Sequence, residues 1–83
     1  MEYHEDVFYD NNDNKIKVEV VFEKEWQEAE KDIGIPSGWV PYFVEQKFSY
    51  KEHQKNWDKL SLKDKMWYRE KWMENIESKL ELQ

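Results

Sequence analysis

Residues with the chemistry for a metal site are few in this chain. It has no cysteine, and its two histidines are His4 and His53. Two histidines cannot complete a zinc site without carboxylates. The segment 10–14 begins like a calcium-binding loop, but Lys15 and Val21 stand where such a loop needs Gly and Glu. We therefore interpret this segment as a turn and expect neither a metal nor a cofactor.

Catalytic motifs are also missing. The two glycines, Gly34 and Gly38, are too few for a glycine-rich phosphate loop. No serine lies in a nucleophile motif, and no pair of acids stands apart from the many that a solvated surface carries. We therefore expect a protein that is not an enzyme. A length of 83 residues is enough for one domain, so residues 1–83 are predicted to form one unit.

The parts of the chain before and after residue 38 differ in net charge. Residues 1–38 carry eleven acidic and four basic residues, whereas residues 39–83 carry eight and nine. The net charge of −6 opposes direct binding to nucleic acid and favours a protein partner with a basic nucleic-acid-binding groove. Solubilising charge is an equally good explanation of the same acids. The predicted acidic binding face consists of Asp10, Asp13, Glu19, Glu23, Glu25, Glu28, Glu30 and Asp32.

A second candidate surface surrounds Trp67, which falls among polar residues of a predicted helix. Exposed aromatic residues are enriched at interface hot spots, so Trp67 with Lys63 and Lys71 forms a predicted aromatic patch. Packing of Trp67 inside the protein is the alternative.

The apolar face of the same helix contains Trp72, Met73 and Ile76 as predicted core or dimer residues. Arg69 lies in the middle of this face and would need an acidic partner, either within the chain or across a homodimer. A homodimer is therefore one of the two arrangements that the sequence allows.

The elements that position these residues follow from the hydrophobic pattern. Residues 3–22 alternate between apolar and polar types on both sides of the turn, which predicts a β-hairpin. Residues 23–32 are rich in helix formers and lack Gly and Pro, which predicts a short helix that ends at Gly34. Residues 40–50 alternate again and predict a third strand, although a helix from Tyr42 is an alternative. Pro41 would place this strand at a sheet edge.

Two helices are predicted after this strand. Ser49 and Ser61 each begin a pattern that resembles a capping box, with an acid three residues on. The last helix runs from Leu62 to about Leu80 and is amphipathic. Its predicted apolar face consists of Leu62, Met66, Trp72, Met73, Ile76 and Leu80. The predicted fold is therefore α+β: a hairpin, a short helix, a third strand and two helices.

No segment has the roughly 20 apolar residues of a membrane span, and there is no signal-peptide pattern. A cytoplasmic location is expected, which would be the host cytoplasm for a phage protein. In size, charge and aromatic content the chain is similar to small acidic phage inhibitors, some of which mimic DNA. This likeness implies a non-catalytic inhibitor or adaptor that blocks a DNA-binding protein.

A second, local resemblance concerns residues 57–68. Trp57, Leu60, Ser61, the pair Asp64-Lys65 and Tyr68 have the spacing found in the second half of an HMG box. This resemblance implies a three-helix domain that bends DNA from the minor groove. The alternative function is therefore nucleic-acid binding through the region from Lys47 to Lys71, in which lysines recur every four residues from 47 to 63.

Overall fold

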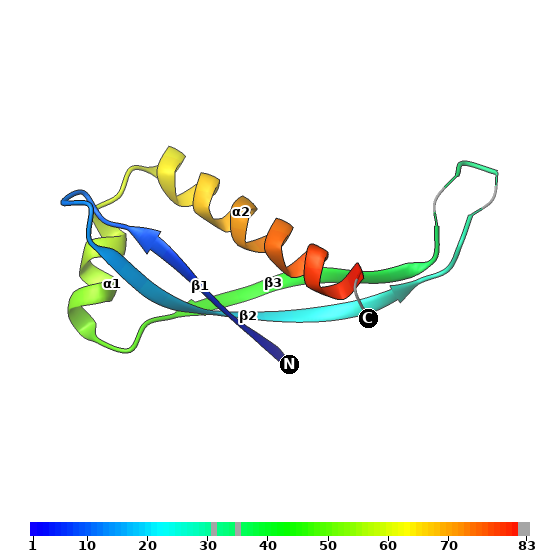
Figure 1. Cartoon of the computed structure of the whole chain (residues 1–83), viewed down its shortest axis with the longest axis horizontal. Helices are drawn as coiled ribbons and strands as arrows, with labels where there is room; N and C mark the ends of the chain where they lie inside the picture. The colour runs from blue at the N-terminus through cyan, green and yellow to red at the C-terminus, as the bar shows by residue number, and fades with distance from the viewer. Residues whose placement is uncertain (31, 35, 82–83) are drawn as a thin grey trace.

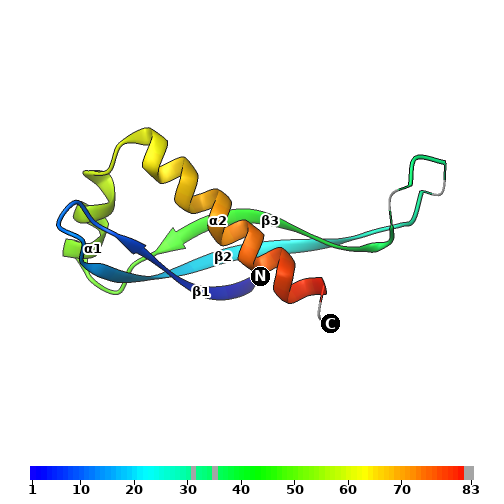
Figure 2. The same cartoon turned by 45° about the horizontal axis from the view of Figure 1, so that its top comes forward.

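The computed structural model describes residues 1–30, 32–34 and 36–81. Three strands, β1 (Glu2–Tyr9), β2 (Lys15–Gln27) and β3 (Gly38–Lys47), form an antiparallel sheet in the order β1-β2-β3. Two helices follow, α1 (Lys51–Asp58) and α2 (Leu62–Glu81). Helix α2 lies across one face of the sheet and α1 lies at one end, so that neither covers the opposite face (Figures 1 and 2).

The predicted first hairpin is confirmed, and Asp10 fixes its turn. One carboxylate oxygen of Asp10 accepts backbone N–H bonds from Asn12 and Asn14, both at 2.9 Å. Asp13 takes the left-handed conformation, with φ of 61°, which Asp tolerates better than most residues. The interpretation of residues 10–14 as a turn is therefore correct, and the Asp10 carboxylate accepts hydrogen bonds from the backbone of that turn.

The predicted helix over residues 23–32 is wrong. Strand β2 continues through this region to Gln27 and pairs with β3, with Glu23 opposite Tyr42 and Trp26 opposite Trp39. Strand pairing overrides the local helix propensity because it satisfies the backbone and places aromatic side chains side by side. A turn follows at residues 32–34, where Gly34 has φ of 72°. Residue 31 of the predicted helix lies outside the described residues.

The third strand and the two later helices are confirmed. Pro41 lies in β3, an edge strand, where its missing N–H does no harm. The Ser61 hydroxyl accepts the Asp64 N–H at 3.1 Å and caps α2 as predicted. The predicted cap at Ser49 is wrong, because Tyr50 precedes α1 at the cap position and makes no side-chain capping bond.

The core lies between the sheet and the helices and is built around two stacked tryptophans. Trp57 of α1 and Trp72 of α2 lie with ring centroids 5.0 Å apart, and Phe8 meets Trp57 edge-on at 5.0 Å. The Trp72 indole N–H donates to the Val7 carbonyl at 2.9 Å, so this buried polar group is satisfied. The buried apolar residues around them are Ile16, Val18, Val20, Phe22, Leu60, Ile76 and Leu80.

The predicted apolar face of α2 is partly wrong. Trp72, Ile76 and Leu80 are buried and Met73 packs against the core, but Leu62 and Met66 are exposed. These two residues occupy the first turns of α2. Tyr68, which is partly buried against the core, takes the inward position that the sequence pattern assigned to them.

Candidate functional surface

Neither of the two described helices lies on one face of the sheet, and we call it the open face. Residues directly paired in antiparallel strands project to the same side of a sheet. Glu5, Glu19 and Lys47 therefore lie together on this face, opposite the side that buries Val18 and Val20. By the same alternation, the remaining residues of the open face on β2 and its partners are Tyr3, Val7, Tyr9, Lys15, Lys17, Val21, Glu23, Glu25, Val40, Tyr42 and Glu45. Val21 is the buried member of this set.

Carboxylates dominate this open face. Glu5, Glu19, Glu23, Glu25 and Glu45 are all exposed. Two basic residues lie beside them: Lys47, whose ammonium is 3.6 Å from the Glu45 carboxylate, and Lys17, which lines the same surface depression as Glu5 and Glu19. Glu5 and Glu19 are direct cross-strand partners, and like charges in that position destabilise a sheet by a few tenths of a kcal/mol to about 1 kcal/mol.

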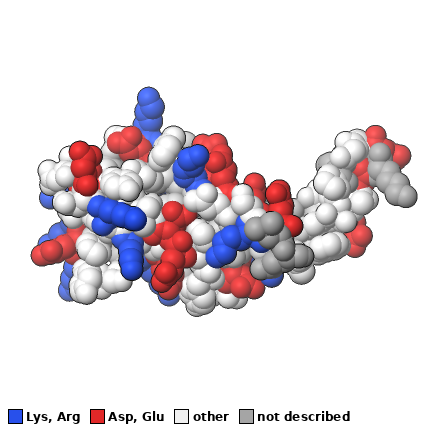
Figure 3. All heavy atoms as spheres, in the orientation of Figure 1, with Lys and Arg blue, Asp and Glu red and all other residues white. Residues whose placement is uncertain are grey.

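The structure brings together some of the predicted acidic residues and separates others. Glu19, Glu23 and Glu25 share the open face, and Glu28, Glu30 and Asp32 continue from it along the β2–β3 connection. In Figure 3 acidic atoms gather at the far tip of this connection. Asp10 is buried, and it lies with Asp13 at the opposite end of the molecule, in the β1–β2 turn (Figure 1). Glu5 and Glu45 belong to the open face but were not in the predicted set.

The predicted aromatic patch forms as a surface cluster. Trp67 is 54% exposed and meets Tyr68 edge-on at 5.0 Å between centroids. The Lys71 ammonium lies 5.9 Å from the Trp67 ring centroid, within the range of a cation–π contact. Lys63 lines a shallow depression next to Trp67, together with Leu62, Met66 and Glu70.

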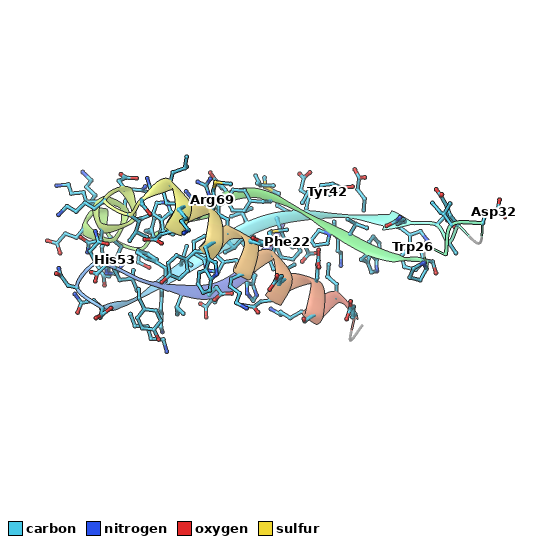
Figure 4. The ribbon with its side chains drawn as sticks, turned by 90° about the horizontal axis from the view of Figure 1, so that it is seen from above. Phe22, Trp26, Asp32, Tyr42, His53 and Arg69 are labelled. Carbon is cyan, nitrogen blue, oxygen red and sulfur yellow. The ribbon has the colours of Figure 1, made fainter. Side chains whose placement is uncertain are left out.

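Arg69 is held by aromatic rings. Its guanidinium carbon lies 5.5 Å from the centroid of Phe43 and 6.0 Å from that of Trp57. None of the ion pairs among the described residues includes Arg69, so the expected acidic partner within the chain is not found there. The rings supply part of the missing stabilisation, because a cation over an aromatic face is attracted by the ring quadrupole. Figure 4 shows Arg69 on α2 beside the sheet.

A polar cluster joins the first strand to the last helix. The His4 ring lies 2.8 Å from the Asp6 carboxylate, and the Lys79 ammonium donates to the other ring nitrogen at 3.2 Å. Asn75 donates to Asp6 at 2.9 Å, and so does the Val7 backbone. Burial alone would raise the pKa of Asp6, but the hydrogen bonds from Asn75, His4 and Val7 outweigh it and lower that pKa. These hydrogen bonds connect β1 to α2, so the cluster acts as a structural clamp between the two elements.

The feature that sequence reasoning missed is an extended hairpin arm, formed by β2 from Glu23, β3 up to Tyr42 and the described residues between them. The arm extends beyond β1 and the end of α2 in a molecule 48 Å long (Figures 1 and 2). Figure 4 shows Phe22 beneath α2, whereas Trp26 and Asp32 lie beyond the helix on the arm. The period of two that identified residues 16–22 is interrupted at Lys24 and resumes at Trp26, and this signal could have revealed the longer strand.

Two tryptophans lie on the side of the arm that faces away from the glutamates. Trp26 and Trp39 are cross-strand partners that meet edge-on at 5.3 Å, and they are 51% and 41% exposed. The Lys24 ammonium lies 4.8 Å from the Trp39 centroid. A cleft of about 440 Å³ lies between this pair and the end of α2, where Leu80 and Glu81 line it.

The described residues contain no group of three or more His, Cys, Asp or Glu side chains that could hold a metal ion. No described helix has the length and apolar character needed to cross a membrane. The chain matches no protein-family model, no curated protein and no solved structure. The described residues form two helices and a sheet, so the three-helix fold implied by the HMG-box resemblance is not the fold of this chain.

Proposed function

We propose that this protein is a non-catalytic inhibitor or adaptor that binds a protein partner through the acidic open face of its sheet. The observation that carries the proposal is the group of five exposed carboxylates, Glu5, Glu19, Glu23, Glu25 and Glu45, on a face that neither described helix covers. The chemistry that complements this face is a groove lined by Lys and Arg.

Spacing supports a more specific form of this proposal, in which the open face imitates DNA. Alternate residues of a strand are about 6.8 Å apart, which equals the rise of about two nucleotides along one strand of a duplex. Glu19, Glu23 and Glu25 follow β2 at multiples of this spacing, and the acids of the connection extend the row. A rigid strand therefore presents charges at intervals that a nucleic-acid-binding groove already accommodates.

The opposed glutamates also favour a bound state. Glu5 and Glu19 face each other across β1 and β2, and Lys47, the partner of Glu19 on β3, lies 3.6 Å from Glu45. The repulsion between the Glu5 and Glu19 carboxylates lowers the stability of the free protein. A partner that places a basic side chain between these two glutamates would remove this repulsion. Binding would then be more favourable than at a neutral surface.

The test compares two triple variants with equal changes of net charge. Glu19→Gln, Glu23→Gln and Glu25→Gln alter the open face, whereas Glu52→Gln, Glu70→Gln and Glu77→Gln alter exposed helix positions. Each protein is immobilised and used to capture partners from an extract of its native cell, and duplex DNA is added as a competitor. We expect the open-face variant to lose a captured protein that the helix variant retains and that DNA displaces.

Three results would contradict this proposal. Equal capture by both triple variants would show that the open face is not the contact. Failure of duplex DNA to compete would remove the DNA-mimic form. Saturable binding of the purified protein itself to duplex DNA at low salt would instead support the alternative, in which the region from Lys47 to Lys71 binds nucleic acid. The lysines of that region are distributed over β3, α1 and α2, so they do not form one continuous helical stripe.

A further inference from the structure

The arm has one edge with no strand beside it. Strand β1 pairs with β2 from Tyr9 opposite Lys15 to Glu2 opposite Phe22, and its pairing ends there. From Glu23 to Gln27, β2 pairs with β3 on one side. No described strand lies on its other side. Backbone N–H and C=O groups on that side have the geometry to accept a further strand, which is the arrangement used in β-strand addition.

The two sides of this free edge differ in chemistry. Glu23 and Glu25 project to the open face, and Lys24 and Trp26 project to the opposite side. Trp26 is half-exposed beside Trp39, at the cleft that ends with Leu80. A strand added here would have its alternate side chains directed to acids on one side and to an indole on the other.

We propose that an extended segment of the protein partner, with alternating basic and apolar residues, adds as a strand to the free edge of Glu23–Gln27. Its basic residues lie beside Glu23 and Glu25, and its apolar residues lie beside Trp26 and the cleft. This inference rests on the proposed function, because it specifies how part of the acidic open face is engaged. Backbone hydrogen bonds supply affinity, and the alternation supplies specificity.

A second copy of this chain is a poor occupant of the same edge. Symmetric antiparallel pairing centred on Glu25 would place that residue opposite its own copy. Centring the pairing on Lys24 would place Lys24 opposite its own copy and Glu23 opposite Glu25. Both registers oppose like charges, which destabilises a sheet. Centring the pairing on Trp26 avoids this, but it pairs only Glu25–Gln27 of the free edge. Charge complementarity therefore favours a basic strand from a different protein.

The experiment uses three synthetic peptides, each capped at both ends. The first is Lys-Val-Lys-Val-Lys-Val, the second has the same sequence with every internal amide N-methylated, and the third is Lys-Lys-Lys-Val-Val-Val. Backbone amide resonances of the full chain are followed during titration with each peptide. We expect the alternating peptide to shift Glu23–Gln27 and to bind at least about tenfold more tightly than the other two.

Variants with matched tryptophan changes test the apolar side. Trp26→Ala should weaken binding of the alternating peptide, whereas Trp67→Ala, which removes another half-exposed tryptophan, should not. Equal binding of the N-methylated peptide would overturn strand addition and leave the electrostatic proposal standing. Absence of shifts at Glu23–Gln27 at millimolar peptide would also overturn it. Failure of the capture experiment would remove the proposed function separately, because that readout does not involve these peptides.

Discussion

At the scale of single residues, several of the chain's polar groups serve the fold. Asp10 accepts three hydrogen bonds within the first turn, from the backbones of Asn12 and Asn14 and from the Asn14 side chain at 3.2 Å. Asp6 is the acceptor in the clamp between β1 and α2. The backbone bond from Asn14 is the main cause of a lowered pKa at Asp10. Acids with such bonds stabilise the folded chain only while they are ionised.

The stability of the protein should therefore fall in acid. Asp6 and Asp10 have pKa values lowered from 3.8 in the folded state, so the unfolded chain binds their protons more readily. Their contribution is complete above about pH 5, falls as the pH passes through about 4, and is lost once the pH drops below the lowered values. Urea unfolding midpoints measured from pH 7 to pH 2.5 should follow this course. The double variant Asp6→Asn, Asp10→Asn should be less stable at pH 7 and lose less between pH 5 and pH 3. An equal loss in both proteins would contradict the assignment.

The Trp72 indole should contribute measurably through its hydrogen bond. Trp72→Phe keeps an aromatic ring against Trp57 but leaves the Val7 carbonyl without its donor and removes part of a buried side chain. We expect the free energy of unfolding to fall by about 1–3 kcal/mol. Chemical denaturation measures this change, and Trp67→Phe at an exposed site is the matched control. Similar effects at both positions would argue against the core described for α2.

At the scale of elements, the two serines before the helices provide a paired test. Ser61→Ala removes a bond to the Asp64 N–H and should destabilise the protein by about 0.5–2 kcal/mol. Ser49→Ala should have little effect, because α1 has no side-chain cap. The stabilities of the two variants are compared by their urea unfolding midpoints. A larger loss at Ser49 would show that α1 begins earlier than the structure places it.

These elements also show what sequence can and cannot predict. The strand over residues 16–22 and the last helix were both predicted correctly as elements, because each has a buried face that repeats with its own period. The apolar face of the last helix was predicted only in part, since Leu62 and Met66 are exposed. The segment 23–27 failed because its Glu and Lys residues favour a helix locally, and its strand depends on a partner about 15 residues away. Trp26 was therefore assigned to the predicted helix, and its contact with Trp39 was not predicted.

The candidate surface was predictable to a similar degree. Trp67 was placed on the polar side of its helix from spacing alone, and it is exposed there. The acids were recognised by composition, but only strand register separates those on the open face from those elsewhere. Glu45 was missed because its position beside Val21 depends on pairing across a register shift in β3.

At the scale of the whole molecule, the arm differs in its packing from the rest of the described chain, which we call the body. The core residues lie in the body, between α2 and the paired regions of β1 and β2. Trp26 and Trp39 on the arm are half-exposed. Stability is therefore expected to depend on the body, and the proposed strand addition on the arm.

Shortening the arm tests this separation. Replacement of residues 24–41 by Asn-Gly joins Glu23 to Tyr42, which already face each other, through a favoured hairpin turn. The shortened protein should keep a cooperative unfolding transition, and X-ray scattering should show a reduced longest dimension. Peptide binding should be lost. Collapse of the body after this change would contradict the division between arm and core.

The arm also restricts the changes in strand length that the protein can tolerate. Adding or removing two residues in each strand would change its reach by about 7 Å and preserve the sides to which its glutamates and tryptophans project. A change of one residue in a strand would exchange those two rows, because side chains alternate with a period of two. Variation in length that preserves binding should therefore occur in even steps, and an odd step would need a compensating bulge such as the irregularity beside Val21 and Phe22.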